Sequence, residues 1–369
     1  MDQYTKANDW RSRSLIALTI SLAALLGACS NGGDDNSDGG GGTTAKSCQD
    51  SYNPELQAAG EDCTPQYGVY CPDSSGSVLN SSEATPCDGV NIAEGSVEVN
   101  GMTSDFLVLT PSGNTSKAVS GTYLALHWAE ANAPTMVDRM RLGELAKARN
   151  LRVIVPTAPG PVRSWGNSVV IPLNSVDQRI AILDAVLAQA DGISKAGGSL
   201  IVGGVSGGGI LAFQYACARA PQVTGSMIVA AEIRSNDLAS CQPAGPFASV
   251  QVHGTADLIA PYMAVPILSA GADEIFQTLY ENNGCNGDNV TATSASGDSN
   301  PLISDIEVKW VKDGCTSGKG SSLITVQNGG HNWPGYSGPL ELPANLYGPT
   351  ADGFDATLQG YDLIKYLGG

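Results

Sequence analysis

The chain is poor in histidine, in aromatic residues and in positive charge. Of its 369 residues only three are histidine and 6% are aromatic, and 19 Lys and Arg stand against 36 Asp and Glu. Phosphate backbones would repel the resulting formal net charge of −17, so we expect no nucleic-acid partner. With only three histidines, each can be considered in turn as a catalytic base or a metal ligand.

Long apolar runs are also missing, apart from one short stretch near the N-terminus. Residues 15–26 are apolar and follow Arg11 and Arg13, which is typical of a secretion signal rather than of a transmembrane helix. The Leu-Gly-Ala sequence before Cys29 looks like a bacterial lipobox, where cleavage leaves the cysteine for lipid attachment. We therefore expect residues 1–28 to be a lipoprotein signal peptide, with export of an unlipidated Cys29 as the alternative.

A lipid on Cys29 would tie the protein to a membrane of the bacterial cell envelope, and we favour the outer membrane. Residues 29–47 are rich in Gly, Ser, Asp and Asn, a composition that predicts a flexible tether.

No Cys-x-x-Cys pair occurs among the nine cysteines, so we expect no metal site. Without Cys29 an even number remains, which predicts disulfides in an exported protein. The early cysteines are expected to pair among themselves with open connectivity; they are Cys48, Cys63, Cys71 and Cys87. Residues 48–92 form a cystine-rich segment, either a small subdomain or a wrap around the domain that follows.

One strand–turn–helix pattern stands out. The apolar residues 199–203 precede Gly204-Val-Ser206-Gly-Gly208, and the apolar-periodic residues 210–219 follow it. This order is the context of a nucleophile elbow, in which the serine is exposed at the carboxyl edge of a sheet. Flanking glycines allow the tight backbone, and the helix N-terminus lends positive potential to an oxyanion. We predict that Ser206 is a nucleophile; a glycine-rich turn with an idle serine is the alternative.

A serine nucleophile needs a base and an acid that orients the base. His127, His253 and His331 each follow a strand-like run, but only His331 completes the chain order Ser, Asp, His of the α/β-hydrolases. The acid in that order is Asp257, in the sequence His253-Gly-Thr-Ala-Asp257. We predict the triad Ser206, Asp257 and His331. His253 is expected to shape the loop of Asp257 or to be an ordinary strand-end histidine.

Further motifs follow in a consistent order. They are Leu126-His127, Arg163-Ser-Trp165, Pro261-Tyr262, Gly329-Gly-His-Asn-Trp-Pro-Gly335 and Phe354-Asp-Ala-Thr357. With the elbow and the Asp257 loop, this set resembles the secreted polyhydroxybutyrate depolymerase-like and feruloyl-esterase-like family of α/β-hydrolases, from about residue 95 to the C-terminus. The resemblance implies an α/β-hydrolase fold and an ester hydrolase with the triad above, and its chemistry needs no cofactor. We favour the local disulfides Cys217–Cys241 and Cys285–Cys315, since similar pairs occur in that family.

The oxyanion donors are expected to be the backbone N–H of Gly207, by the elbow rule, and that of Ala129 or Trp128. The resembled family has Gly after the histidine of the third strand, whereas Trp128 follows His127 here. A tryptophan at this place would narrow or reshape the acyl pocket.

Two further tryptophans are expected at the mouth of the site. Trp165 and Trp333 follow strand ends, and we predict that they bind substrate together with His127. Packing beneath the loops is the alternative for both tryptophans, and a hydrogen-bonded strand end is the alternative for His127.

Strand and helix patterns alternate over residues 93–369, which predicts a catalytic domain with a mostly parallel sheet flanked by helices. Residues 95–110 alternate around Asn-Gly and predict a hairpin, and residues 136–150 predict one helix. The polar stretch 286–320 contains a strand-like run at 306–311, and we interpret it as a surface excursion closed by Cys285 and Cys315.

The expected reaction is acyl transfer to Ser206 followed by hydrolysis, with activity rising between about pH 6 and 7 as His331 becomes neutral. We expect a monomeric, lipid-anchored carboxylesterase that acts on 3-hydroxyalkanoate oligomers or polymer. Because the chain carries no extra polymer-binding domain, soluble oligomers or small esters are favoured. Aryl or feruloyl esters of plant walls are the main alternative; a binding protein without catalysis and a serine peptidase are the others.

Overall fold

The structure is a computed structural model that describes residues 48, 51–63, 89–112, 118–166, 175–195, 197–293, 300–335 and 347–368. All of them belong to one compact unit, Lys46–Gly369. The predicted signal peptide, the tether and Cys29 lie outside the described residues, as do Cys71 and Cys87. What the sequence indicates about them stays a prediction.

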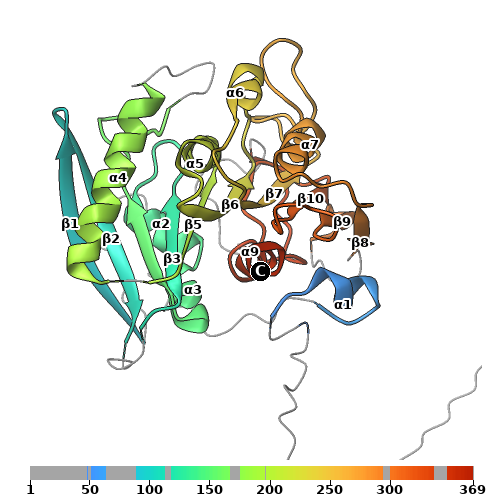
Figure 1. The fold of residues 1–369 in the computed structure, drawn as a ribbon, viewed down its shortest axis with the longest axis horizontal. Coiled ribbons are helices and arrows are strands. Elements are labelled where there is room, and N and C mark those ends of the chain that lie inside the picture. The colour runs from blue at the N-terminus through green and yellow to red at the C-terminus, as the bar shows by residue number, and fades with distance from the viewer. Residues whose placement is uncertain are drawn as a thin grey trace, which may run out of the picture. The chain divides into compact units, whose positions relative to one another are not determined.

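A ten-stranded sheet forms the centre of this unit (Figure 1). Its strands are β1 (Val90–Val99), β2 (Met102–Pro111), β3 (Gly121–Leu126), β4 (Arg152–Pro156), β5 (Ser199–Val205), β6 (Val223–Val229), β7 (Ala248–Gly254), β8 (Val290–Thr293), β9 (Asp305–Val311) and β10 (Ser321–Gln327). Their order in the sheet is β1-β2-β4-β3-β5-β6-β7-β10-β9-β8. The neighbours from β4 to β10 are parallel, and antiparallel pairs extend the sheet at both ends.

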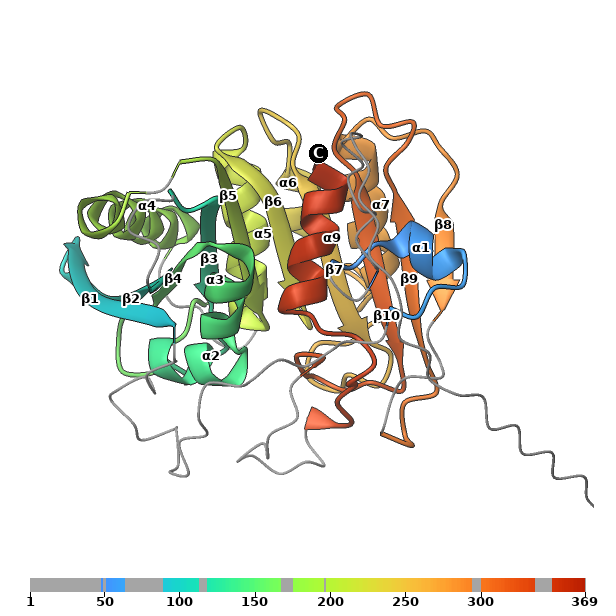
Figure 2. The same cartoon turned by 90° about the horizontal axis from the view of Figure 1, so that it is seen from below.

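Helices cover both faces of the sheet. They are α1 (Pro54–Ala58), α2 (Ala133–Arg139), α3 (Leu142–Arg149), α4 (Val176–Ile193), α5 (Gly207–Arg219), α6 (Ser235–Ser240), α7 (Ala272–Asn282) and α9 (Leu358–Gly368). On one face Leu183 of α4 and Leu211 of α5 are fully buried against Val202 of β5. On the other face α2, α3 and α9 form a second core, and α9 lies over β6 and β7 (Figure 2). No helix among the described residues is both long and apolar enough to span a membrane.

The burial of the central strands follows from this layering. Every residue of β3, β4 and β7 is buried, as expected for parallel strands that are covered on both faces. The predicted α/β-hydrolase fold, with a mostly parallel sheet flanked by helices, is therefore confirmed. Because β5, β7 and β10 run in one direction, the residues that follow them meet at one edge of the sheet, called the carboxyl edge below.

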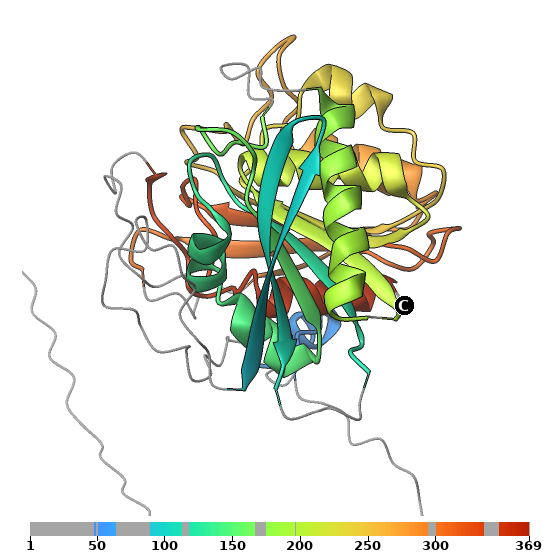
Figure 3. The same ribbon diagram turned by 90° about the vertical axis from the view of Figure 1, so that its left-hand side faces the viewer.

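The predicted hairpin is also confirmed. β1 and β2 are antiparallel and are joined by Asn100 and Gly101, which both have positive φ (52° and 76°). Positive φ at both central residues is the two-residue turn that Asn-Gly favours. Figure 3 shows this hairpin beside α4.

The prediction of one helix over residues 136–150 was wrong. Two helices, α2 and α3, occupy this stretch, and the break falls at Arg141, whose φ is 47°. The left-handed backbone ends the first helix, and the guanidinium of Arg141 forms ion pairs with Glu144 and Asp355. A buried charge pair with a residue more than two hundred positions away thus interrupts a pattern that looks continuous in sequence.

The interpretation of residues 286–320 as a surface excursion was also wrong. β9 pairs along its whole length with β10 and extends the main sheet, and β8 pairs with β9. Ile306, Val308 and Trp310 of β9 are buried in the core. The disulfide Cys285–Cys315 lies beside this antiparallel end of the sheet.

The described part of the N-terminal segment packs on the main domain. Its disulfide joins Cys48 and Cys63, and Tyr52 donates a backbone hydrogen bond to Asp362 of α9 (3.1 Å). These contacts join the described part of the segment to the main domain, and whether the whole segment is a wrap or a subdomain stays a prediction. The pair Cys217–Cys241 is present as well, so both local disulfides that the sequence favours are formed.

Candidate active site

Ser206 lies at the turn between β5 and α5 in a strained backbone conformation. Its φ of 55° and ψ of −125° are unfavourable for a residue with a side chain. It occupies the N-cap position of α5, where a serine normally accepts a hydrogen bond from the helix, yet its side chain makes no such bond. The side chain is half-buried, and the residue lies at the carboxyl edge of the sheet.

The glycines of the turn allow two segments to approach closely. A Cβ atom on Gly208 would lie 2.1 Å from the carbonyl oxygen of Leu126, and one on Gly204 would lie 2.4 Å from the backbone of Gly208. A Cβ on Gly207, in contrast, would meet nothing within 4 Å. The elbow is therefore pressed against the end of β3 on one side and faces open space beside Gly207.

Asp257 and His331 form a buried hydrogen-bonded pair at the same edge. Nδ1 of His331 lies 2.8 Å from Oδ2 of Asp257. The aspartate side chain is completely buried, and that of His331 is 5% exposed. Asp257 follows β7 and His331 follows β10, while Ser206 follows β5 on the other side of β6. The three residues of the predicted triad thus share the carboxyl edge, and exposure rises from the acid to the base to the serine.

A second histidine contacts the same aspartate. Nε2 of His253 lies 2.8 Å from the carbonyl oxygen of Ala260 and 3.4 Å from Oδ2 of Asp257. A carbonyl only accepts, so Nε2 carries a hydrogen. The sequence predicts no catalytic role for His253, although it indicates that this residue shapes the Asp257 loop.

The surroundings of Asp257 keep its carboxyl group ionised. Burial alone raises its pKa, but hydrogen bonds from His253, His331 and the backbone N–H of Ala260 outweigh burial and hold the pKa well below its usual range. The other oxygen, Oδ1, accepts the N–H groups of Ile259 (2.9 Å) and Ala260 (2.8 Å). An ionised, fully oriented carboxylate can fix the tautomer of His331 and stabilise its protonated form.

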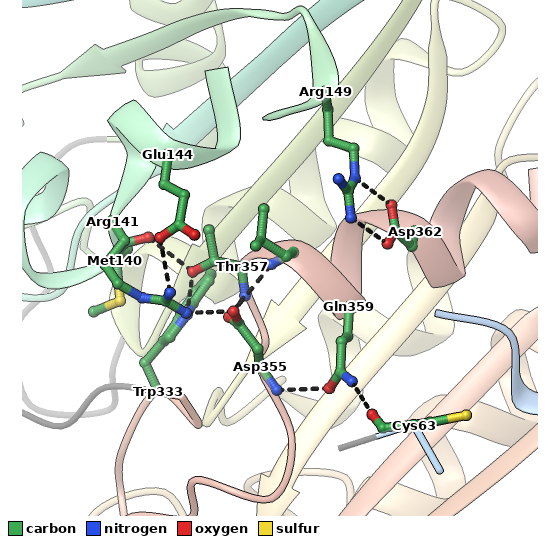
Figure 4. Close-up of polar contacts among 11 residues, drawn as sticks. Cys63, Met140, Arg141, Glu144, Arg149, Trp333, Asp355, Thr357, Gln359 and Asp362 are labelled. Carbon is green, nitrogen blue, oxygen red and sulfur yellow. Dashed lines mark hydrogen bonds and ion pairs between the residues drawn. The ribbon is translucent and has the colours of Figure 1, made fainter. Parts of the chain in front are cut away.

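The loop of His331 is fixed by the motif Phe354-Asp-Ala-Thr357 near the C-terminus, called the closing motif below. Nε1 of Trp333 donates to Oγ1 of Thr357 (3.0 Å), and the Thr357 hydroxyl donates to the carbonyl of Met140 (2.7 Å). Asp355 accepts the backbone N–H of Thr357 and binds Arg141, as Figure 4 shows. Trp333 is 4% exposed and its indole N–H is used within the protein, and a role in substrate binding stays a prediction.

The N-terminal segment reaches the same network. Gln359 accepts the backbone N–H of Asp355 (2.8 Å) with its side-chain oxygen, and its amide nitrogen donates to the carbonyl of Cys63 (2.6 Å; Figure 4). The cystine segment is thereby connected through α9 to the loop that carries His331.

His127 holds the loop after β3. Its Nε2 accepts the N–H of Ala158 (3.0 Å), so the hydrogen is on Nδ1, which donates to the carbonyl of Trp128. Its pKa is lowered to about 4, chiefly by burial; the hydrogen bond to the Trp128 carbonyl opposes this shift and the charge of Arg163 contributes to it. Both ring nitrogens are used and the ring is fully buried, which agrees with the strand-end alternative.

The loop after β4 packs against this histidine. The rings of Trp165 and His127 are 5.6 Å apart, and Trp165 is fully buried, so a role in substrate binding stays a prediction. Trp128 is half-buried and Ala129 is half-buried beside it, next to the elbow. Among the residues that the structure describes, no group of three His, Cys, Asp or Glu side chains could hold a metal ion.

Comparisons with known proteins give likenesses of fold alone. No protein-family model matches the chain, and no curated protein matches it. An acetyl xylan esterase from Aspergillus awamori is similar at 13% identity with a TM-score of 0.48, covering 65% of this chain and 94% of that one. A predicted CIB-like hydrolase from Thermoplasma acidophilum is 15% identical with a TM-score of 0.42, covering 76% and 99%. Est1E from Butyrivibrio proteoclasticus is 10% identical with a TM-score of 0.40, covering 64% and 90%.

Proposed function

We propose that this protein is a serine-dependent carboxylic ester hydrolase with the triad Ser206, His331 and Asp257. The observation that carries the proposal is the buried Asp257–His331 hydrogen bond at the edge where the strained, uncapped Ser206 lies. A strained serine at a strand-to-helix turn and an oriented histidine are the two parts that acyl transfer needs. The esterases and hydrolases of similar fold are in accord with this proposal, which does not rest on them.

The chemistry follows from the roles that each group can fill. Nε2 of His331 takes the proton of Ser206 as its oxygen attacks the ester carbonyl, and returns that proton to the leaving alcohol. Water then attacks the acyl-enzyme by the same route and regenerates the serine. Asp257 remains ionised throughout, because its four hydrogen-bond donors stabilise the negative charge.

The oxyanion of the tetrahedral intermediate would be bound by backbone N–H groups. Gly207 is the first residue of α5, so its N–H is not used within the helix. The close approach of Gly208 to Leu126 and His127 brings the start of α5 against the end of β3. The N–H of Ala129 or Trp128 is therefore the second donor that we propose.

The substrate that we propose is a 3-hydroxyalkanoate ester, as oligomer or polymer. The proposed substrate rests on the motifs around Ser206, Asp257 and His331. In this proposal the half-buried side chain of Trp128 shapes the acyl pocket. We further propose export and a lipid on Cys29. The three disulfides of the described residues suit an extracellular or periplasmic location.

The test uses the full chain, produced in an oxidising compartment, and its Ser206→Ala variant. Hydrolysis of p-nitrophenyl acetate, methyl ferulate and 3-hydroxybutyrate oligomers is measured for both proteins. The mass shift of each protein after reaction with an organofluorophosphonate is measured as well. Activity and a single covalent adduct in the wild type, both absent from the variant, support the proposal. Activity that survives in the variant would contradict the assignment of the triad. A preference for methyl ferulate would indicate an aryl esterase instead.

A further inference from the structure

Large apolar side chains are exposed mainly at the carboxyl edge. Among the described residues eight are exposed, and five of them lie in one loop between β7 and α7: Leu258, Ile259, Met263, Ile267 and Leu268. Val162 follows β4, and Leu302 precedes β9, whose start pairs with the end of β10. These seven residues therefore lie at the carboxyl edge, which also carries Ser206, and they are called the apolar rim below. Only Ile193, at the end of α4, lies at the opposite edge.

Ile267 is the most exposed of these residues and is strained. It is 97% exposed and has a φ of 72°. It occupies the third position of a turn that the N–H of Leu268 closes on the carbonyl of Val265 (2.9 Å), where Gly or Asn is usual. A β-branched residue with left-handed backbone is unfavourable, and full exposure offers it no packing in return. Strain without a structural benefit points to a function of the exposed side chain.

The backbone of this loop is firmly held. Val265 and Ser269 exchange two backbone hydrogen bonds (3.1 and 3.0 Å), and the N–H of Ala272 donates to the carbonyl of Tyr262 (2.8 Å). The N–H groups of Ile259 and Ala260 bind the carboxylate of Asp257. The loop therefore begins at the proposed catalytic acid and presents its apolar side chains outward from the edge of the site.

We propose that the apolar rim adsorbs the enzyme to the surface of a dispersed, uncharged and water-insoluble ester, which is its own substrate. The inference rests on the proposed function and specifies the physical form of the substrate. It revises the expectation of soluble oligomers or small esters, because the catalytic domain itself carries an apolar surface next to the site. Five exposed apolar side chains in one loop that begins at the proposed catalytic acid mark a binding surface for an apolar partner.

Charge decides which apolar partner fits. Residues 258–268 contain no charged side chain, although the whole chain has a net charge of −17. Anionic bilayers would repel a protein of this charge, and so would a second copy of the chain. An uncharged ester phase meets no such repulsion and leaves the neighbouring site facing its substrate.

The experiment compares the full-length wild type with the double variant Met263→Ser/Ile267→Asn and with Ile193→Ser as the matched control. Asn tolerates a positive φ, so the double variant loses apolar surface and also loses the strain at residue 267. Depletion of enzyme from solution is measured with an emulsion of water-insoluble, end-esterified 3-hydroxybutyrate oligomers, with anionic vesicles and with phosphatidylcholine vesicles. The rate on the emulsion, kcat/KM on p-nitrophenyl acetate, the Tm and the sedimentation coefficient are measured in parallel.

The wild type and Ile193→Ser should adsorb to the emulsion. The affinity of the double variant for the emulsion should be at least about tenfold lower, because two exposed apolar side chains are removed. Its rate on the emulsion should fall equally, while kcat/KM on the soluble ester stays unchanged and the Tm is equal to or above that of the wild type. Equal adsorption of all three proteins, an equal loss in Ile193→Ser, stronger binding to vesicles, or a change of oligomeric state would overturn the inference. Absence of activity on the soluble ester in the wild type overturns the proposed function instead, because adsorption is measured separately.

Discussion

The Nε2 atom of His253 lies 3.4 Å from Oδ2 of Asp257, the same oxygen that accepts the hydrogen bond of His331. Both side chains are almost completely buried. Since Nε2 of His253 also donates to the carbonyl of Ala260, its ring joins the end of β7 to the loop of the proposed catalytic acid. The position of the acid therefore depends on a histidine outside the triad.

Replacing His253 by Phe should lower kcat/KM and move its acidic limb to higher pH. A buried aromatic ring is kept, but Asp257 loses one donor and becomes a better acceptor for the protonated His331. His253→Gln, which can still donate to Ala260, should lie between the two. The pH dependence of kcat/KM is measured for all three proteins with a soluble ester. Coincident profiles for the wild type and His253→Phe would reduce His253 to a packing role.

The elbow predicts opposite results for two adjacent glycines. Gly207→Ala should leave the Tm unchanged, because the new Cβ meets nothing within 4 Å, but should lower kcat/KM by up to about 10²-fold by intruding beside the oxyanion donors. Gly208→Ala should instead destabilise the fold, since its Cβ would lie 2.1 Å from the carbonyl oxygen of Leu126. Thermal unfolding and kinetics distinguish the two. An active, stable Gly208→Ala protein would contradict the close approach to β3.

Stability should fall on acidification through His127. Burial lowers the pKa of this histidine to about 4, so between about pH 6.5 and 4 the unfolded chain binds a proton that the folded protein does not. Stability contributed by the neutral ring is present above pH 6.5 and is lost as the pH falls through this window. The expected loss between pH 7.5 and 5 is about 2 kcal/mol.

Urea unfolding of the wild type and of His127→Gln at both pH values provides the measurement. The variant cannot titrate at this position, so its stability should depend less on pH by about the same 2 kcal/mol. An identical pH dependence in the two proteins would show that the acid-labile step lies elsewhere.

Local patterns in the sequence predicted much of this fold. Asn100-Gly101 defined the hairpin, because its two residues adopt positive φ at low cost. Gly204-Val-Ser206-Gly-Gly208 placed the elbow, because only glycine fits against Leu126 on one side of the turn. Both features depend on the backbone geometry of a few neighbouring residues, and the residue types in the sequence indicate that geometry directly.

Features that depend on distant partners could not be predicted in this way. The break at Arg141 arises from its ion pair with Asp355, and the burial of Trp165 depends on the position of His127. The place of β9 in the sheet follows from its pairing with β10 rather than from its polar flanks. The strain at Ile267 is likewise invisible in a sequence, because Pro-Ile has no intrinsic preference for a positive φ.

The closing motif predicts a coupling between stability and catalysis. Arg141 and Asp355 are 6% and 2% exposed, so Asp355→Ala removes one of the two carboxylates that pair with a buried cation and leaves only Glu144. The loss should be about 3–5 kcal/mol of unfolding free energy. Thr357→Val keeps Asp355 but removes the acceptor of Trp333 and the donor to Met140, and should cost about 1–3 kcal/mol.

Both variants should also lower kcat, because Trp333 lies two residues after His331 and Thr357 fixes its indole. Thr357→Ser keeps the hydroxyl and should restore kcat together with most of the stability. The free energy of unfolding is measured in urea. The kcat value is measured without urea at a temperature well below the Tm of each variant, so that all the proteins are folded. If Thr357→Val were destabilised but turned over at the wild-type rate, the hydrogen bond of Trp333 would hold the fold without positioning His331.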